Sequence, residues 1–193
     1  MRFGICKGTF MQKKVKNIIA AVALAVIATV PACGYSLSGT GNIVPQGVKT
    51  LAVPVFLNAT YEPYVDVQVT QAVVEEFLTD GRLKVVSLED AELALRGKIT
   101  KYEAIPLSYN PQSFVQQYRV RMVVDAVLED LRSKKVIWKE RGIESVLISD
   151  YAVSYDPAGK ADISLTKIAK DVAIKSASKD IAKTLRSRVL EGF

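Results

Sequence analysis

The amino-acid sequence predicts an α+β fold, a two-layer sandwich in which two helices pack on one face of a mostly antiparallel sheet of four to five strands. Two stretches, 91–100 and 118–128, alternate apolar and polar residues, which is the pattern of antiparallel strands with one buried face. Two further stretches, 64–78 and 161–190, repeat apolar residues every three or four positions, which indicates amphipathic helices.

Shorter strands are predicted on either side of the first helix. Residues 48–56 are apolar and β-branched enough for a strand, and Pro54 marks an edge or a bulge in it. The helix over 64–78 ends at Gly81, because glycine adopts a left-handed cap at little cost. A short strand over 83–87 follows. The apolar stripe of this helix consists of Val65, Val69, Ala72, Val73 and Phe77.

The longer strands are separated by two predicted loops. In the first alternating strand, Gly97 occupies an apolar-face position where another group packs closely or the strand bends. The loop 106–113 contains two prolines, and a second loop covers 149–160. Between them, the strand 136–148 contains Trp138, which is predicted to be a core residue.

The last helix, 161–190, would be roughly 40 Å long at about 1.5 Å per residue, which is enough to cross a sheet. Its predicted apolar side is Leu165, Ile168, Val172, Ala177, Ile181, Leu185 and Val189. The predicted core includes Leu95, Ile99, Val120, Met122, Val124, Ile181 and Leu185.

The chain begins with a basic stretch and a short apolar run. Residues 18–30 are thirteen residues that are all apolar except Thr29. The run is too short to span a membrane, which takes about 20 apolar residues, but it suits the apolar region of a secretory signal, about 7–15 residues long. Residues 1–32 are therefore predicted to be a signal peptide, with Met11 as a more natural start than Met1.

Cys33 is the predicted lipidation site. Residues 30–33, Val-Pro-Ala-Cys, resemble the lipobox of bacterial lipoproteins, in which a peptidase cuts just before a cysteine that carries diacylglycerol. Pro31 departs from the small residue that is usual at its position. Two alternatives are an ordinary secretory signal with an incidental cysteine and an uncleaved apolar anchor.

Residues 33–47 are rich in Gly, Ser and Pro and are predicted to be a lipidated, flexible tether. Residues 48–193 are predicted to form a single α+β domain, because the mature chain of about 161 residues is long enough for one core and short for two. Cys33 is the only cysteine of that chain, which excludes an internal disulfide.

Composition argues against nucleic-acid binding and against most catalytic chemistry. The formal charge is +6, but five of the 26 Lys and Arg precede Cys33, so the mature chain keeps 21 basic against 20 acidic residues. This balance removes the electrostatic reason for a nucleic-acid partner. The chain has no histidine, the commonest general base and metal ligand. We therefore expect no catalytic residues, no metal site and no cofactor.

A basic cluster is the one candidate binding site in the sequence. Lys134, Lys135, Lys139 and Arg141 lie at and beside the predicted turn over 129–135. Such cations could clamp the phosphates of an anionic lipid. The alternative is an ordinary solvated turn.

Short motifs spread along the chain resemble one family. They are Cys-Gly-Tyr-Ser-Leu at 33–37, Val-Pro-Val-Phe at 53–56, Asp-Gly-Arg at 80–82, Leu-Arg-Gly-Lys-Ile at 95–99 and Gln-Tyr-Arg-Val at 117–120. In this order and spacing they resemble the lipopolysaccharide-assembly lipoprotein family LptE, whose fold is two helices on a four-stranded sheet.

The resemblance implies a non-catalytic outer-membrane lipoprotein that faces the periplasm. Such a protein sits inside the large β-barrel LptD as a plug, assists the assembly of the barrel and helps deliver lipopolysaccharide to the outer leaflet. Gly34 fits outer-membrane sorting, since Asp at that position usually retains lipoproteins in the inner membrane. In the family, basic residues near strand ends contact the phosphates of the lipid, which makes the basic cluster a candidate by analogy.

Two other classes remain open. One is a generic outer-membrane lipoprotein that serves as a pilotin or scaffold for another envelope complex. The other is a periplasmic hydrolase on a small α+β domain, for which a Ser/Lys pair would have to replace the missing histidine.

Overall fold

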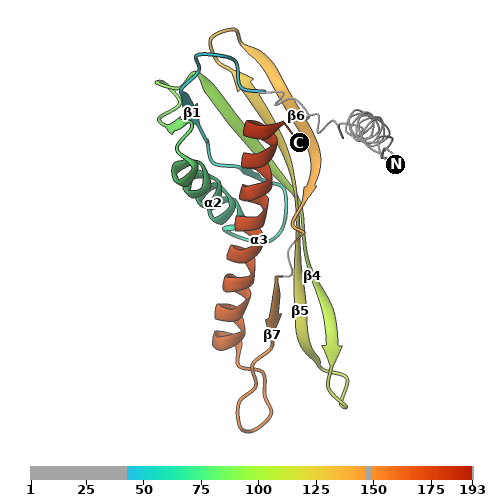
Figure 1. Ribbon diagram of the computed structural model, residues 1–193. Coiled ribbons are helices and arrows are strands. Elements are labelled where there is room, and N and C mark those ends of the chain that lie inside the picture. The colour runs from blue at the N-terminus through green and yellow to red at the C-terminus, as the bar shows by residue number, and fades with distance from the viewer. Residues whose placement is uncertain (1–42, 147–148, 193) are drawn as a thin grey trace, which may run out of the picture. The chain divides into compact units, whose positions relative to one another are not determined.

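Two long strands form the centre of the sheet in the computed structural model, which describes residues 43–146 and 149–192 (Figure 1). β4 (Leu93–Tyr109) pairs antiparallel with β5 (Val115–Asp130). β6 (Lys135–Glu144) continues the sheet on the other side of β5, also antiparallel. The predicted signal peptide, Cys33 and most of the predicted tether lie outside the described residues.

The strand β4 is longer than predicted. The expected loop over 106–113 is wrong at its start, because β4 continues to Tyr109 and pairs with β5 up to Val115. Pro106 has no amide hydrogen to donate, and a proline is tolerated where one edge of a strand is free. β4 has such an edge here, since the described strands beside it reach only as far as Ile99.

The sheet is mixed, so the prediction of a mostly antiparallel sheet of four to five strands is wrong. β1 (Thr50–Ala52) pairs parallel with both β3 (Lys84–Val85) and β4, and β2 (Leu57–Asn58) pairs parallel with β4. The described sheet has seven strands, five of them in the order β3-β1-β4-β5-β6. The reason is that a helix separates β1 from β3, and a strand-helix-strand connection makes the two strands parallel.

Only residues 50–52 of the predicted strand 48–56 form a strand, and a second short strand begins just after the predicted range. β1 ends at Ala52 and β2 begins at Leu57, with Pro54 between them. The proline interrupts hydrogen bonding, as its position in the sequence suggested. The break brings Phe56 into the core, where its ring lies directly against Gly97 and would collide with any Cβ at that position. The close approach predicted at Gly97 is therefore confirmed.

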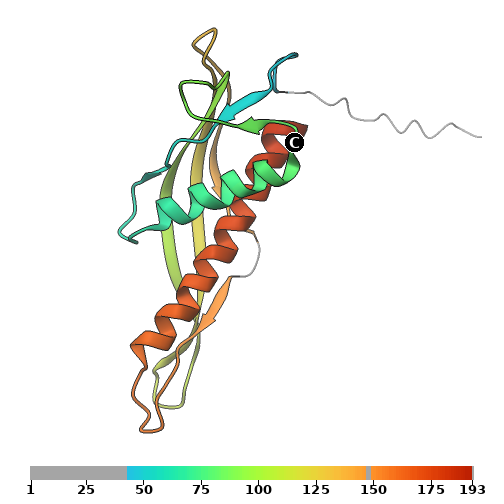
Figure 2. The ribbon, with the colours of Figure 1, turned by 90° about the vertical axis from the view of Figure 1, so that its left-hand side faces the viewer.

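Both helices cover the same face of the sheet (Figure 2). α2 (Val65–Asp80) buries every residue of its predicted stripe and ends at Gly81, whose left-handed backbone lets its N–H donate to the carbonyl of Phe77 at 3.1 Å. α3 (Ile163–Glu191) is capped at its N-terminus by Asp162, whose carboxylate accepts from the N–H of Leu165 at 3.0 Å. Two helices packed on one side of the sheet confirm the α+β architecture.

A network of charged groups joins the C-terminal ends of the two helices. Arg186 of α3 lies 3.0 Å from Glu76 and 3.2 Å from Asp80 of α2, and 3.3 Å from Glu191. A hydrogen bond from Arg82 lowers the pKa of Asp80, so that carboxylate remains charged and stabilises the contact at neutral pH. The network links the two helices at this end.

The core lies between the helices and the inner face of the sheet. The predicted core residues are all buried, with exposed fractions of 2% or less: Leu95, Ile99, Val120, Met122, Val124, Ile181 and Leu185. Trp138 is half-buried and packs against this core, at its margin.

The predicted apolar side of the last helix is correct only in its second half. Ala177, Ile181, Leu185 and Val189 are buried, whereas Leu165, Ile168 and Val172 are 54%, 60% and 65% exposed. The reason is the five-residue step from Val172 to Ala177, which turns the helix by about 140° beyond a full turn. The two halves of the predicted side therefore lie on different faces of α3.

The predicted loop over 149–160 contains a short strand. β7 (Asp150–Ala152) pairs antiparallel with residues 117–119 of β5. Arg119 donates to both carboxylate oxygens of Asp150, at 2.7 and 2.9 Å, and the rings of Tyr118 and Tyr151 stack at 5.4 Å. A strand of three residues is too short for alternation to reveal, so its partners across the sheet decide its structure.

Candidate functional site

The face of the sheet that carries no helix holds the candidate site. Side chains on paired strands point to the same face when their residues are partners in register. Arg96 of β4 is opposite Val127 of β5, which is opposite Lys139 of β6, and Lys98 is opposite Asp125. These side chains surround a depression of about 360 Å³, which we call the basic depression. Its lining includes Arg96, Lys98, Asp125, Val127, Lys139 and Arg141.

Three of the four cations in the basic depression are not neutralised by the protein. Arg96 forms an ion pair with Glu129 at 3.0 Å. Within the described part of the chain, Lys98, Lys139 and Arg141 have no carboxylate within 4.0 Å of their charged nitrogens. Like charges that face the same depression repel one another, and a bound anion would relieve that repulsion.

The single carboxylate of the basic depression belongs to Asp125. It accepts a hydrogen bond of 2.9 Å from the backbone N–H of Gly142. Asp125 therefore binds the backbone of β6. Because the lining has four cations and one carboxylate, the depression has an excess of positive charge.

A β-bulge interrupts β6 beside the basic depression. The pairing of β5 with β6 shifts between Val124 and Ala126, where the partner residues run from Ile143 to Glu140. Gly142 lies in this bulge with a φ of 72°, a left-handed conformation that glycine adopts without steric cost. Lys139 and Arg141 are two residues apart and share a face by ordinary strand alternation. The extra residue after Arg141 brings Ile143 back to the buried face.

Elsewhere on this face the arginines are paired. Arg121 lies 2.6 Å from Glu144 and 3.6 Å from Glu103, and Arg119 is bound to Asp150. The hydrogen bonds to these carboxylates raise the pKa of both guanidinium groups. The unneutralised charge on this face is therefore concentrated at the basic depression.

The structure separates the four predicted binding residues into two pairs. Lys139 and Arg141 line the basic depression. Lys134 lies in the turn between β5 and β6 with a φ of 54°, and Lys135 begins β6. At about 3.3 Å per strand residue, Lys135 is roughly 20 Å from Arg141 along the strand. Sequence reasoning missed Arg96 and Lys98, although their alternation on the predicted strand placed both on its polar face.

The described residues form neither a metal site nor a membrane-spanning helix. In residues 43–146 and 149–192, no three or more His, Cys, Asp or Glu side chains are gathered in a way that could hold a metal ion. Among the helices that the structure describes, none combines the length and the apolar character needed to cross a bilayer.

Comparisons with solved structures give weak similarity over most of the chain. Rare lipoprotein B from Shewanella oneidensis has 19% sequence identity and a TM-score of 0.39, covering 72% of this chain and 96% of its own. A minor lipoprotein from Acinetobacter baumannii has 16% identity and a TM-score of 0.43, covering 75% and 92%. The hypothetical protein CT253 from Chlamydia trachomatis has 13% identity and a TM-score of 0.47, covering 75% and 97%.

Comparison of the amino-acid sequence with family models gives a clearer similarity than the solved structures do. No curated protein matches it. A family model described as lipopolysaccharide-assembly, LptE, matches residues 48–189, which extend from just before β1 almost to the end of α3. The chain therefore belongs to the lipopolysaccharide-assembly family LptE.

Proposed function

We propose that this chain is an outer-membrane lipoprotein, anchored by acyl chains on Cys33, that plugs the β-barrel LptD and assists its assembly. In this role it helps deliver lipopolysaccharide to the outer leaflet and catalyses no reaction. The basic depression is the observation that carries the proposal, because a lipopolysaccharide-assembly protein needs a surface that meets an anionic lipid.

The chemistry of the basic depression suits phosphate groups. Lipopolysaccharide carries phosphates on its lipid portion, and hydrogen bonds between phosphate oxygens and charged nitrogens are roughly twice as strong as neutral ones. Arg141 can bind two phosphate oxygens at once, while Lys98 and Lys139 act as point charges. Since these three cations have no ion-pair partner among the described residues, a phosphate would not compete with a carboxylate for them.

The surface of the chain supports a position inside a barrel. The interior of a wide outer-membrane barrel is polar, so a folded domain that enters it needs a polar surface. The helix-free face of the sheet is polar in this way, because it carries ion pairs such as Arg121 with Glu144 and Lys101 with Glu103. Gly34, which follows the lipidation site, supports sorting to the outer membrane.

Removal of cations from the basic depression should weaken binding of lipopolysaccharide. We expect the double variant Lys139→Ser/Arg141→Ser to bind immobilised lipopolysaccharide about tenfold or more weakly, since each lost charge-assisted hydrogen bond is worth about 1.5–3 kcal/mol. The mature protein, purified in detergent, would be measured at several salt concentrations. Binding of the wild type should fall as salt rises, and the variant should show a smaller salt dependence.

The chain offers a control with the same loss of charge. The variant Lys134→Ser/Lys135→Ser removes two cations from the same hairpin, at its turn, and should change the affinity by less than about twofold. Equal weakening by the two variants would show that binding depends on overall charge, and the basic depression would then lose its role.

A further inference from the structure

The end of the hairpin formed by β4 and β5 is uncharged and apolar. No Asp, Glu, Lys or Arg occurs between Glu103 and Arg119, and this end projects beyond the first turn of α3 (Figure 1, Figure 2). Contiguous apolar patches on a folded surface commonly mark sites where another molecule binds. We call its exposed apolar side chains the tip patch, which consists of Ile105, Leu107, Tyr109 and Phe114.

The turn at the end of the hairpin satisfies its own backbone donors. The N–H of Asn110 donates to the carbonyl of Phe114 at 2.9 Å, and the N–H of Ser113 donates to the carbonyl of Asn110 at 2.9 Å. The side-chain oxygen of Asn110 accepts from the N–H of Gln112 at 3.0 Å and from the N–H of Phe114 at 2.9 Å. Pro111 has no N–H. Every backbone N–H from Asn110 to Phe114 is therefore satisfied without water, as an apolar medium requires.

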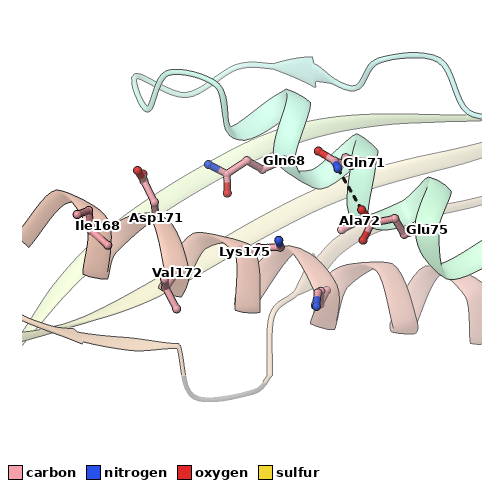
Figure 3. A pocket seen from close by; sticks show the side chains of 9 residues that line it. Gln68, Gln71, Ala72, Glu75, Ile168, Asp171, Val172 and Lys175 are labelled. Atoms are coloured by element: carbon pink, nitrogen blue, oxygen red, sulfur yellow. Dashed lines mark hydrogen bonds between the residues drawn. The ribbon is translucent and has the colours of Figure 1, made fainter.

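The other exposed apolar surface, on α3, differs because charged groups surround it. Ile168 and Val172 line a groove of about 400 Å³ between α2 and α3 (Figure 3). Charged side chains are costly to transfer into a bilayer, so this groove is poorly suited to lipid, whereas the tip patch carries no such cost. The charged residues that line the groove are Glu75, Asp171, Lys175 and Lys179.

We propose that the tip patch inserts into the interfacial region of one leaflet of a phospholipid bilayer, a contact that goes beyond the proposed function and does not depend on it. Exposed Tyr and Phe rings suit this region, because their apolar bodies enter the lipid while the Tyr hydroxyl remains near water. The uncharged side chains and the satisfied turn meet both requirements of such a medium.

The charged residues beside the hairpin limit the depth of insertion. Arg119, which is paired with Asp150 at 2.7 Å, is five residues from Phe114, or roughly 17 Å at about 3.3 Å per strand residue. The hydrocarbon of one leaflet is about 15 Å thick, half of a core of about 30 Å. This ion pair therefore stays at the level of the headgroups when the tip patch is inserted.

The acyl chains on Cys33 do not by themselves bring the tip patch to a bilayer. β1, the strand that follows the tether in the chain, pairs with β4 at Leu93. Tyr109 is 16 residues further along β4, roughly 53 Å away at about 3.3 Å per residue. Contact of the tip patch with lipid would therefore be a second attachment, distinct from the anchor.

Tryptophan fluorescence in vesicles tests this attachment. The chain has a single tryptophan, so Trp138→Phe gives a background without one. Phe114→Trp and Tyr109→Trp place a reporter in the tip patch, and Val172→Trp and Val136→Trp are controls of similar exposure. The four positions are 62%, 60%, 65% and 57% exposed. The mature acylated protein would be inserted in phosphatidylcholine vesicles whose chains carry bromine, which quenches tryptophan only at contact.

We expect quenching in the tip patch to be about threefold or more stronger than at the controls, since charged surroundings keep the controls in water. Bromine near the headgroup should quench more than bromine near the chain end. Because these lipids have no net charge, added salt should not change the result.

A charge placed in the tip patch should remove the contact. In the Phe114→Trp background, Leu107→Asp should lower quenching about threefold or more, to the level of the controls. The matched change Val136→Asp, at an exposed apolar position outside the tip patch, should leave quenching unchanged. Circular dichroism melts would show that both variants are folded.

Three outcomes would overturn the inference. Equal quenching at all four reporter positions would show that the tip patch has no special contact with the bilayer. Quenching that appears only after lipopolysaccharide is added would assign the tip patch to that lipid. A shift of tip emission that depends on protein concentration without vesicles would assign it to a second copy of the chain. The vesicles contain no barrel, so each of these outcomes leaves the plug function standing.

Discussion

Replacing Met122 with Asp should lower the free energy of unfolding by about 3–5 kcal/mol, because it places an unpaired carboxyl group among buried apolar side chains. Met122 is fully buried in β5 and lies opposite Tyr102 of β4. Since a domain of this size is stable by about 5–15 kcal/mol, most of that stability would be lost. Urea or thermal unfolding followed by circular dichroism measures the change.

A second substitution at the same position controls for the loss of methionine itself. Met122→Leu keeps the volume and apolar character of the side chain and should cost less than about 1.5 kcal/mol. Leu185→Asp, on the buried face of α3, should be as destabilising as Met122→Asp. If Met122→Asp unfolded at the same urea concentration as the wild type, the assignment of the inner face of β5 would be wrong.

Replacing Cys33 with Ser should abolish lipid attachment. The thiol is the predicted acceptor of diacylglycerol, and cleavage before this residue depends on that modification. The variant should therefore incorporate no labelled palmitate and should keep the mass of the uncleaved precursor. The wild type should take up the label and begin at Cys33, held stably because two or more acyl chains bind a membrane far better than one.

The second cysteine of the sequence supplies the control. Cys6→Ser should leave both the palmitate signal and the mature mass unchanged, since Cys6 precedes the predicted cleavage site. An unmodified mature protein that begins at another residue would disprove the prediction for Cys33.

The central strands and the core could be predicted because each depends on a regular pattern in the sequence. In β5, alternation from Val120 to Leu128 reports directly which side chains face the helices. The parallel pairs made by β1, β2 and β3 involve only two residues each, so their partners are decided by the crossover of α2. In α3, one five-residue step moved the apolar residues to another face, which a count of apolar residues does not detect.

The basic depression could be predicted only in part, for a related reason. Lys139 and Arg141 stand out in the sequence because they are close to other cations. Arg96 and Lys98 belong to the same depression through the pairing of β4 with β5 and of β5 with β6. A sequence pattern shows which face of a strand is polar. Which residues of the adjacent strands lie beside it on that face depends on the pairing register between the strands.

Isolation of the acylated protein from cell envelopes, followed by measurement of its partners and their amounts, is the most direct test of the plug function. The mature protein would be purified by a C-terminal affinity tag in mild detergent, with crosslinked and uncrosslinked samples compared by mass spectrometry. A plug should bring down one large outer-membrane barrel in an equal molar amount. Recovery of a different envelope complex without a barrel, as a pilotin or scaffold would give, would contradict the proposed function.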